Sequence, residues 1–156
     1  MRAPEDGRWQ RGIRVGIDVG KVRIGVALSD PDGILASPLR TITRTPDDDG
    51  VRQIAQIVAD LAATEVIVGL PIALTGREGL AAADVRNYAL LLARAIAPVP
   101  VRLSDERMST VVASRRLAER GVRGKRQRAV VDQAAAVEIL QSWLESQRRR
   151  PDDRRA

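Results

Sequence analysis

Asp18 is the first residue in this sequence whose type and surroundings suggest chemistry. It lies in the apolar run 14–20, and a second apolar run, 24–28, follows after a short turn. A carboxylate in an apolar strand is costly unless a metal ion, hydrogen-bond donors or a basic partner compensate its charge. Aspartate is also depleted in strands. The alternative is an aspartate that stabilises the tight turn before Gly20, and this segment alone leaves both interpretations open.

Two further acidic residues follow predicted buried segments. Glu106 comes after the apolar run 99–103, and ligands of α/β sheets bind at strand ends and the loops that follow them. The alternative for Glu106 is a favourable charge at a helix N-terminus. Asp132 opens the last predicted helix, on the same face as Ala136, Ile139, Leu140 and Trp143. Its carboxylate should therefore point toward the sheet, which is compatible with a role as a helix cap.

The composition restricts the chemistry that these carboxylates could perform. The chain has no histidine and no cysteine, which excludes Ser-His-Asp and Cys-His nucleophiles and any histidine or cysteine metal site. Aspartate, glutamate, lysine, arginine, serine and threonine must carry any reaction. Oxygen ligands favour Mg²⁺ or Mn²⁺ as a cofactor. The lack of cysteine also excludes a disulfide scaffold.

The positive charge is concentrated near the C-terminus. Residues 1–114 hold 14 basic and 14 acidic residues, whereas residues 115–156 hold 12 basic and 6 acidic ones, which accounts for the net charge of +6. Such a cluster attracts phosphate backbones; the alternative is a solvated helix face followed by a loop. Only three aromatic residues are present, so recognition of the backbone and shape is expected rather than base stacking. The basic patch comprises Arg115, Arg116, Arg120, Arg123, Lys125, Arg126 and Arg128.

The hydrophobic patterns predict one α/β domain, a mixed five-stranded sheet with helices on both faces. Predicted strands cover residues 14–20, 22–29, 34–41, 65–69 and 99–103. Predicted helices cover residues 46–63, a segment ending near 97, a segment after 106, and 131–146.

The two ends of the chain are polar and lack a buried-face pattern. We therefore expect a disordered arm at 1–12, a domain at 13–147 and a disordered charged tail at 148–156. No apolar run approaches the ~20 residues of a membrane span, and the first residues lack the apolar centre of a signal peptide. A cytoplasmic protein without membrane contact is expected.

Four segments of the chain are distinctive together: GIDVGKVRIGVALSD, VIVGLPIALTGREG, LSDERMST and VDQAAAVEILQSWL. In this order and spacing they resemble the YqgF/RuvX family of RNase H-like proteins. The resemblance covers roughly residues 14–144 and implies an RNase H-like fold. The family includes proteins associated with processing the 5′ end of the small-subunit rRNA precursor and with resolution of four-way DNA junctions.

The resemblance implies that Asp18, Glu106 and Asp132 are the catalytic, metal-binding residues. It also implies that Arg23, Arg107 and the Ser109-Thr110 pair belong to the site, and that the loop at 69–71 lines it. Two positions depart from the family pattern: Val22 stands where members often carry lysine, and Ala73 where many carry asparagine. The expected nucleic-acid contacts are the basic patch and Lys21, Arg23, Arg107 and Thr110.

The expected function is a metal-dependent endonuclease that acts on structured RNA or branched DNA. Its favoured role is 5′-end processing of pre-16S rRNA in ribosome biogenesis. The alternative is a Holliday junction resolvase in DNA recombination and repair, which would need a homodimer to cut two strands symmetrically.

Two other classes of protein fit less well. A non-catalytic assembly factor that binds nucleic acid would share the basic patch, but three acids without metal would repel phosphate. A sugar-kinase or chaperone-type ATPase needs two domains of this kind, and 156 residues supply about half of one.

Overall fold

The computed structural model describes residues 9–108 and 125–155. Along the chain they form β1 (Arg14–Val19), β2 (Arg23–Ser29), β3 (Ala36–Thr43), α1 (Asp49–Leu61), β4 (Glu65–Leu70), α2 (Leu80–Ile96), β5 (Val101–Asp105), the 3₁₀ turn η1 (Glu106–Met108) and α4 (Lys125–Arg155).

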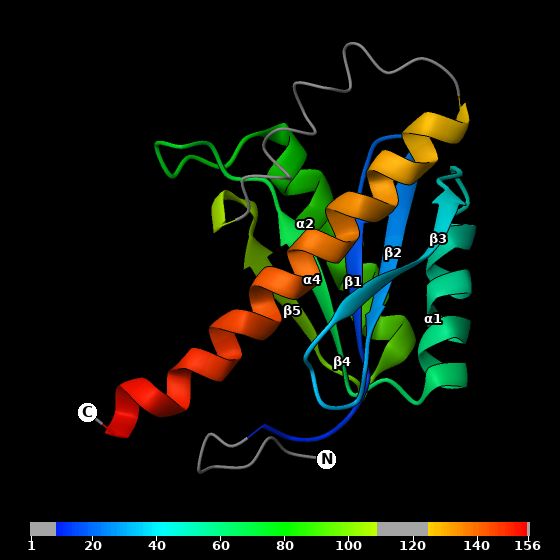
Figure 1. The fold of residues 1–156 in the computed structure, drawn as a ribbon. Helices are drawn as coiled ribbons and strands as arrows, with labels where there is room; N and C mark the ends of the chain where they lie inside the picture. The colour runs from blue at the N-terminus through cyan, green and yellow to red at the C-terminus, as the bar shows by residue number, and fades with distance from the viewer. Residues whose placement is uncertain (1–8, 109–124, 156) are drawn as a thin grey trace.

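The five strands form one mixed sheet in the order β3-β2-β1-β4-β5. Strands β1, β2 and β3 pair antiparallel, whereas β4 pairs parallel with both β1 and β5. Helices α1 and α2 cover one face, and α4 crosses the other face diagonally (Figure 1). The predicted mixed five-stranded sheet with helices on both faces is therefore confirmed.

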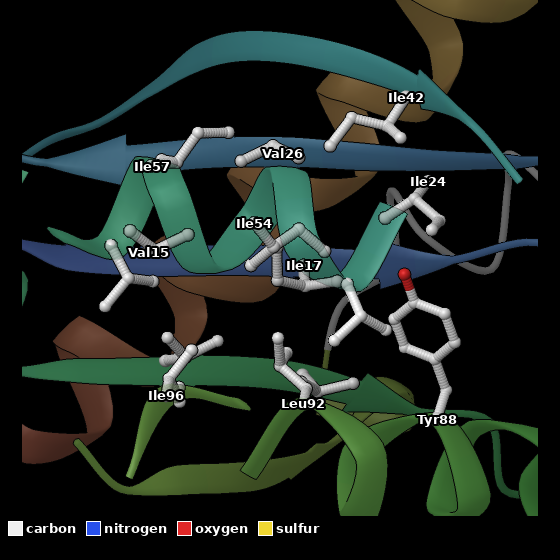
Figure 2. Close-up of a cluster of buried hydrophobic side chains, with 14 of the residues drawn as sticks. Val15, Ile17, Ile24, Val26, Ile42, Ile54, Ile57, Tyr88, Leu92 and Ile96 are labelled. Carbon is white, nitrogen blue, oxygen red and sulfur yellow. The ribbon is translucent and has the colours of Figure 1, made fainter. Parts of the chain in front are cut away.

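The core on the α1/α2 face follows from the two-residue alternation of the strands. Val15 and Ile17 of β1 are fully buried in this cluster, where they pack with side chains of both helices. Figure 2 shows Tyr88, Leu92 and Ile96 of α2 in the same cluster. The intervening residues of β1 must point to the opposite face, which α4 covers.

The last helix is longer than predicted at both ends. It spans Lys125–Arg155, whereas the apolar pattern predicted 131–146 and a disordered tail from 148. Arginine, glutamine and glutamate are good helix formers, so a helix can continue where its apolar stripe has ended. The helix predicted after residue 106 is described only as η1, and the rest of that prediction lies outside the described residues.

Residues 9–12, part of the expected disordered arm, contact the domain. Trp9 Nε1 and the backbone N–H of Gly12 both donate hydrogen bonds to the Pro31 carbonyl, at 3.2 and 2.9 Å. The Trp9 ring stacks on Arg14, whose Cζ lies 3.8 Å from the ring centre, and meets Trp143 edge-on at 6.3 Å. A single tryptophan among polar residues gives no periodic pattern, which explains why the sequence did not indicate this contact.

None of the helices in the described ranges combines the length and apolar character needed to cross a membrane.

Candidate active site

Asp18 lies near the end of β1 on the face covered by α4. Ile17, the residue before it, points into the core on the α1/α2 face, so the Asp18 side chain points to the α4 face. Asp18 is 1% exposed. Directly across the antiparallel pair lies Gly25 of β2. The missing side chain at Gly25 leaves room beside the Asp18 carboxylate, and α4 occupies that room.

Asp132 is placed beside Asp18 by the close approach of α4 to β2. A Cβ atom on Gly25 would overlap the backbone carbonyl oxygen of Asp132. The Asp132 side chain is buried, and its Oδ2 accepts a hydrogen bond from Arg23 Nε at 2.8 Å. Arg23 therefore supplies the positive charge that a buried carboxylate requires.

Glu106 approaches the same region from the other side of β1. It opens η1, directly after β5, and is buried. Its Oε1 lies 3.1 Å from the position that a Cβ atom on Gly69 would take. Gly69 belongs to β4, which pairs in parallel with β1 through Ile17 and Val68. The two flanking acids thus lie over the strands on either side of Asp18.

Three glycines on adjacent strands make this arrangement possible. A Cβ at Gly16 would lie 2.7 Å from the Leu140 Cβ, one at Gly69 would lie 2.5 Å from Ile139 Cδ1, and Gly25 meets the Asp132 backbone. Glycine inside a strand often marks the close approach of another backbone. Glycines within apolar strand patterns are the signal in the sequence that corresponds to this close approach of α4.

The donor chemistry of the three acids fits a hard divalent cation. They are buried carboxylates on one face of one sheet, and Mg²⁺ and Mn²⁺ prefer such oxygen ligands. As the side chains lie here, the described residues contain no group of three acids close enough to share one metal ion. Arg23 engages the Oδ2 atom of Asp132, so a metal ion that bound through this oxygen would require the ion pair to rearrange.

The basic residues expected to contact nucleic acid lie in different environments. Arg23 is mostly buried in its ion pair, and Lys21 is exposed in the β1–β2 turn. Arg107 forms a forked ion pair with Asp105, which lowers the pKa of Asp105 and raises that of Arg107. Lys125, Arg126 and Arg128 begin α4. Thr110, Arg115, Arg116, Arg120 and Arg123 lie outside the described residues.

Arg44 holds the turn that follows Asp18, a role that sequence reasoning missed. Its Nη1 donates to the Gly20 carbonyl at 3.0 Å, and its two Nη atoms each donate to one carboxylate oxygen of Asp84 at 2.7 Å. Its Cζ lies 5.1 Å from the centre of the Tyr88 ring, and burial raises the pKa of Tyr88 to about 12. Arg44 and Asp84 are 40 residues apart and resemble ordinary surface charges in the sequence.

The Arg44–Asp84 pair should make stability depend on pH. The hydrogen bond from Arg44 lowers the pKa of Asp84 below 3.8, so its contribution is present above that pH and is lost as pH falls through the lowered pKa. Because Asp84 is 43% exposed, Asp84→Asn should cost about 1 kcal/mol or less. Urea unfolding between pH 6 and 3 should show that the difference in unfolding free energy between Asp84→Asn and wild type becomes smaller at low pH.

Asp32→Asn is the matched control, since Asp32 forms its ion pair with Arg11 on the open surface. We expect it to unfold like wild type at each pH. An Asp84→Asn deficit that persists unchanged at pH 3 would show that the ion pair is not its source.

Comparison with known proteins identifies one family and relatives that share one name. A family profile described as "RuvX: Holliday junction resolvase" matches residues 12–146. A Mycobacterium sp. (strain KMS) protein named "Putative pre-16S rRNA nuclease" is 58% identical over 93% of this chain and 86% of its own length. A Rhodococcus erythropolis protein of the same name is 55% identical over 89% of this chain and 81% of its own length.

The solved structures confirm the predicted RNase H-like fold. Thermus thermophilus RuvC in complex with a Holliday junction substrate superposes with a TM-score of 0.59 at 16% identity, covering 88% of this chain and 96% of RuvC. A second structure of Thermus thermophilus RuvC gives a TM-score of 0.55. At this identity the likeness concerns the arrangement of strands and helices alone.

Proposed function

The chain belongs to the RuvX family, and on that premise we propose that it is a Mg²⁺- or Mn²⁺-dependent endonuclease. Its proposed substrate is pre-16S rRNA, because the relatives at 55–58% identity are named "Putative pre-16S rRNA nuclease". We further propose that it acts at the 5′ end of this RNA and in the cytoplasm. The observation that carries the proposal is the placement of Asp18, Glu106 and Asp132. These three buried carboxylates lie on or over neighbouring strands of one sheet, Asp132 against Gly25 and Glu106 against Gly69, in a chain without histidine or cysteine.

The proposed role of each residue follows from the element that positions it. Asp18 is fixed by β1, Glu106 by η1 and Asp132 by α4, and these three would ligate the metal. When bound, the metal would supply an activated water and neutralise charge at the scissile phosphate. Arg23 compensates the charge of Asp132 and would donate to a phosphate oxygen once that ion pair opens. The basic patch, whose last three residues begin α4, would hold the nucleic-acid backbone.

A Holliday junction resolvase remains the second candidate, because the family profile carries that description. Such an enzyme would act as a homodimer, since a symmetric cut of two strands needs two active sites. The non-catalytic binding factor is disfavoured by the acids themselves. Three buried carboxylates have no evident use for a protein that only binds a polyanion, because without metal they would repel phosphate.

The decisive experiment compares two labelled substrates with and without divalent metal. One is an RNA spanning the 5′ end of pre-16S rRNA, and the other is a four-way DNA junction. The proposal requires cutting of the RNA at a discrete position in Mg²⁺ or Mn²⁺ and none in EDTA. Cutting confined to the junction, by a dimer, would support the resolvase, whereas binding of either substrate without cutting would support the assembly factor.

The basic patch should give binding a steep salt dependence. If about four to six of its residues contact phosphates, the logarithm of the binding constant on duplex DNA should fall with slope about −0.9 per contact against the logarithm of salt concentration. Replacing Arg123, Lys125, Arg126 and Arg128 by glutamine should flatten this slope. Fluorescence anisotropy in a salt series measures it.

Arg52→Gln provides the control, because Arg52 is exposed on α1, across the sheet from α4. Its slope should equal that of wild type. An unchanged slope in the fourfold variant would remove the patch from the binding surface.

A further inference from the structure

The loop between β4 and α2 presents two leucines to solvent. Leu74 in the loop is 92% exposed, and Leu80, the first residue of α2, is 91% exposed. Single exposed leucines are common on protein surfaces. These two leucines lie in one protruding segment beside the candidate active site, which suggests that their exposure has a function.

Hydrogen bonds give the tip of this loop a defined shape. The backbone N–H of Ala73 donates to the Arg77 carbonyl at 2.9 Å, and that of Gly76 donates to the Ala73 carbonyl at 2.8 Å. Gly76 has a φ of 87°, a value that glycine adopts readily. Leu74 therefore extends from a closed turn, and its exposure follows from the fold of the turn.

The turn stands next to the candidate active site. The loop leaves β4 just after Gly69, which lies against the Glu106 carboxylate. Arg107 Nη1 lies 3.8 Å from the position that a Cβ atom on Gly76 would take. Figure 1 shows the loop projecting beyond the sheet on the side where β5 ends in η1. An apolar tip thus projects from the end of the sheet that carries Glu106.

One cation at the tip is suited to a polyanion. Arg77 is exposed in the same turn, and the described residues offer it no acidic partner, since Glu78 beside it pairs with Arg86 and Asp105 pairs with Arg107. An apolar side chain beside an exposed arginine is suited to nucleic acid, because the arginine can bind a phosphate while the apolar group meets the bases.

We propose that Leu74 is a wedge that enters the base stack of the bound nucleic acid beside the scissile phosphate. This inference rests on the proposed nuclease function. Leucine is one of the side chains that proteins insert between base steps, which unstacks the bases and bends the strand. With only three aromatic residues in the chain, an aliphatic side chain takes this role. Unstacking would open the backbone next to the carboxylates.

The test uses 2-aminopurine, a base whose fluorescence rises when it is unstacked, placed on either side of the mapped cleavage position in the pre-16S RNA substrate. Binding of the full-length protein should raise the emission. Leu74→Ala should abolish the rise at saturating protein, weaken binding by about tenfold, the loss expected for one buried leucine side chain, and leave the salt slope unchanged. Leu90→Ala, an exposed leucine on α2, should behave as wild type.

The outcomes separate the wedge from the proposed function. Metal-dependent cutting by wild type without any rise in emission would overturn the wedge and leave the nuclease intact. Absence of binding and cutting by wild type would overturn both. A Leu74→Ala protein that keeps the emission change but converts from dimer to monomer would assign this leucine to a contact between copies of the chain, and the wedge would again be wrong.

Discussion

Asp18→Asn is expected to abolish metal-dependent cleavage while the protein remains folded. Asparagine has nearly the same size as aspartate and keeps hydrogen-bonding capacity, so the buried position at the end of β1 can accept it. It lacks the charge that a divalent metal requires from its ligand. Metal assistance is worth several kcal/mol in the transition state, so the cleavage rate should fall at least about a hundredfold. Single-turnover cleavage in Mg²⁺ and urea unfolding measure the two effects.

The other two acids should lose activity with different effects on stability. Asp132→Asn removes the charge partner of the mostly buried Arg23, so it should also reduce the free energy of unfolding. Glu106→Gln and Asp18→Asn should leave that free energy near the wild-type value or above it. Asp60→Asn, on the exposed surface of α1, is the control for both measurements. If all three neutralised variants still cleave, the nuclease mechanism assigned to these residues is wrong.

Each of the three acids lies in or beside an apolar pattern, and the family resemblance implied that together they form one site. Asp18 stands in a buried strand, Glu106 follows one, and Asp132 lies on the apolar stripe of a helix. The order of the elements then predicted a mixed sheet with helices on both faces, whereas the strand order came from the structure. These features can be recognised in the sequence because strand alternation and helix periodicity are local properties of the chain.

The contacts that orient the acids could not be predicted in the same way. The ion pairs Arg23–Asp132 and Arg44–Asp84 join residues far apart in the chain. The resemblance placed Arg23 in the site without indicating its partner, and nothing local distinguishes Arg44 among the 24 arginines in the sequence. Trp9 likewise has no periodic neighbours. Such contacts depend on which surfaces the fold brings together, so they emerge only in three dimensions.

Gly25 should be the most sensitive position for stability near the site. In Gly25→Ala, the new Cβ atom would overlap the backbone carbonyl of Asp132. Because backbone atoms cannot rotate aside as a side chain can, α4 must move away from β2. Overpacking of this kind should cost about 3 kcal/mol, and urea unfolding will measure it. Gly79→Ala is the matched control, since a Cβ atom there meets nothing within 4 Å, and its change should stay within about 0.5 kcal/mol.

The same contact that packs α4 also sets Asp132 beside Asp18, so Gly25→Ala should reduce stability and cleavage together. Asp18→Asn, by contrast, should remove cleavage alone. If Gly25→Ala unfolds at the wild-type urea concentration, α4 does not lie against β2 as described here. If it loses stability but retains full cleavage, Asp132 acts independently of its position over Gly25. Loss of both in Gly25→Ala, beside loss of cleavage alone in Asp18→Asn, would show that one glycine couples folding of the last helix to assembly of the site.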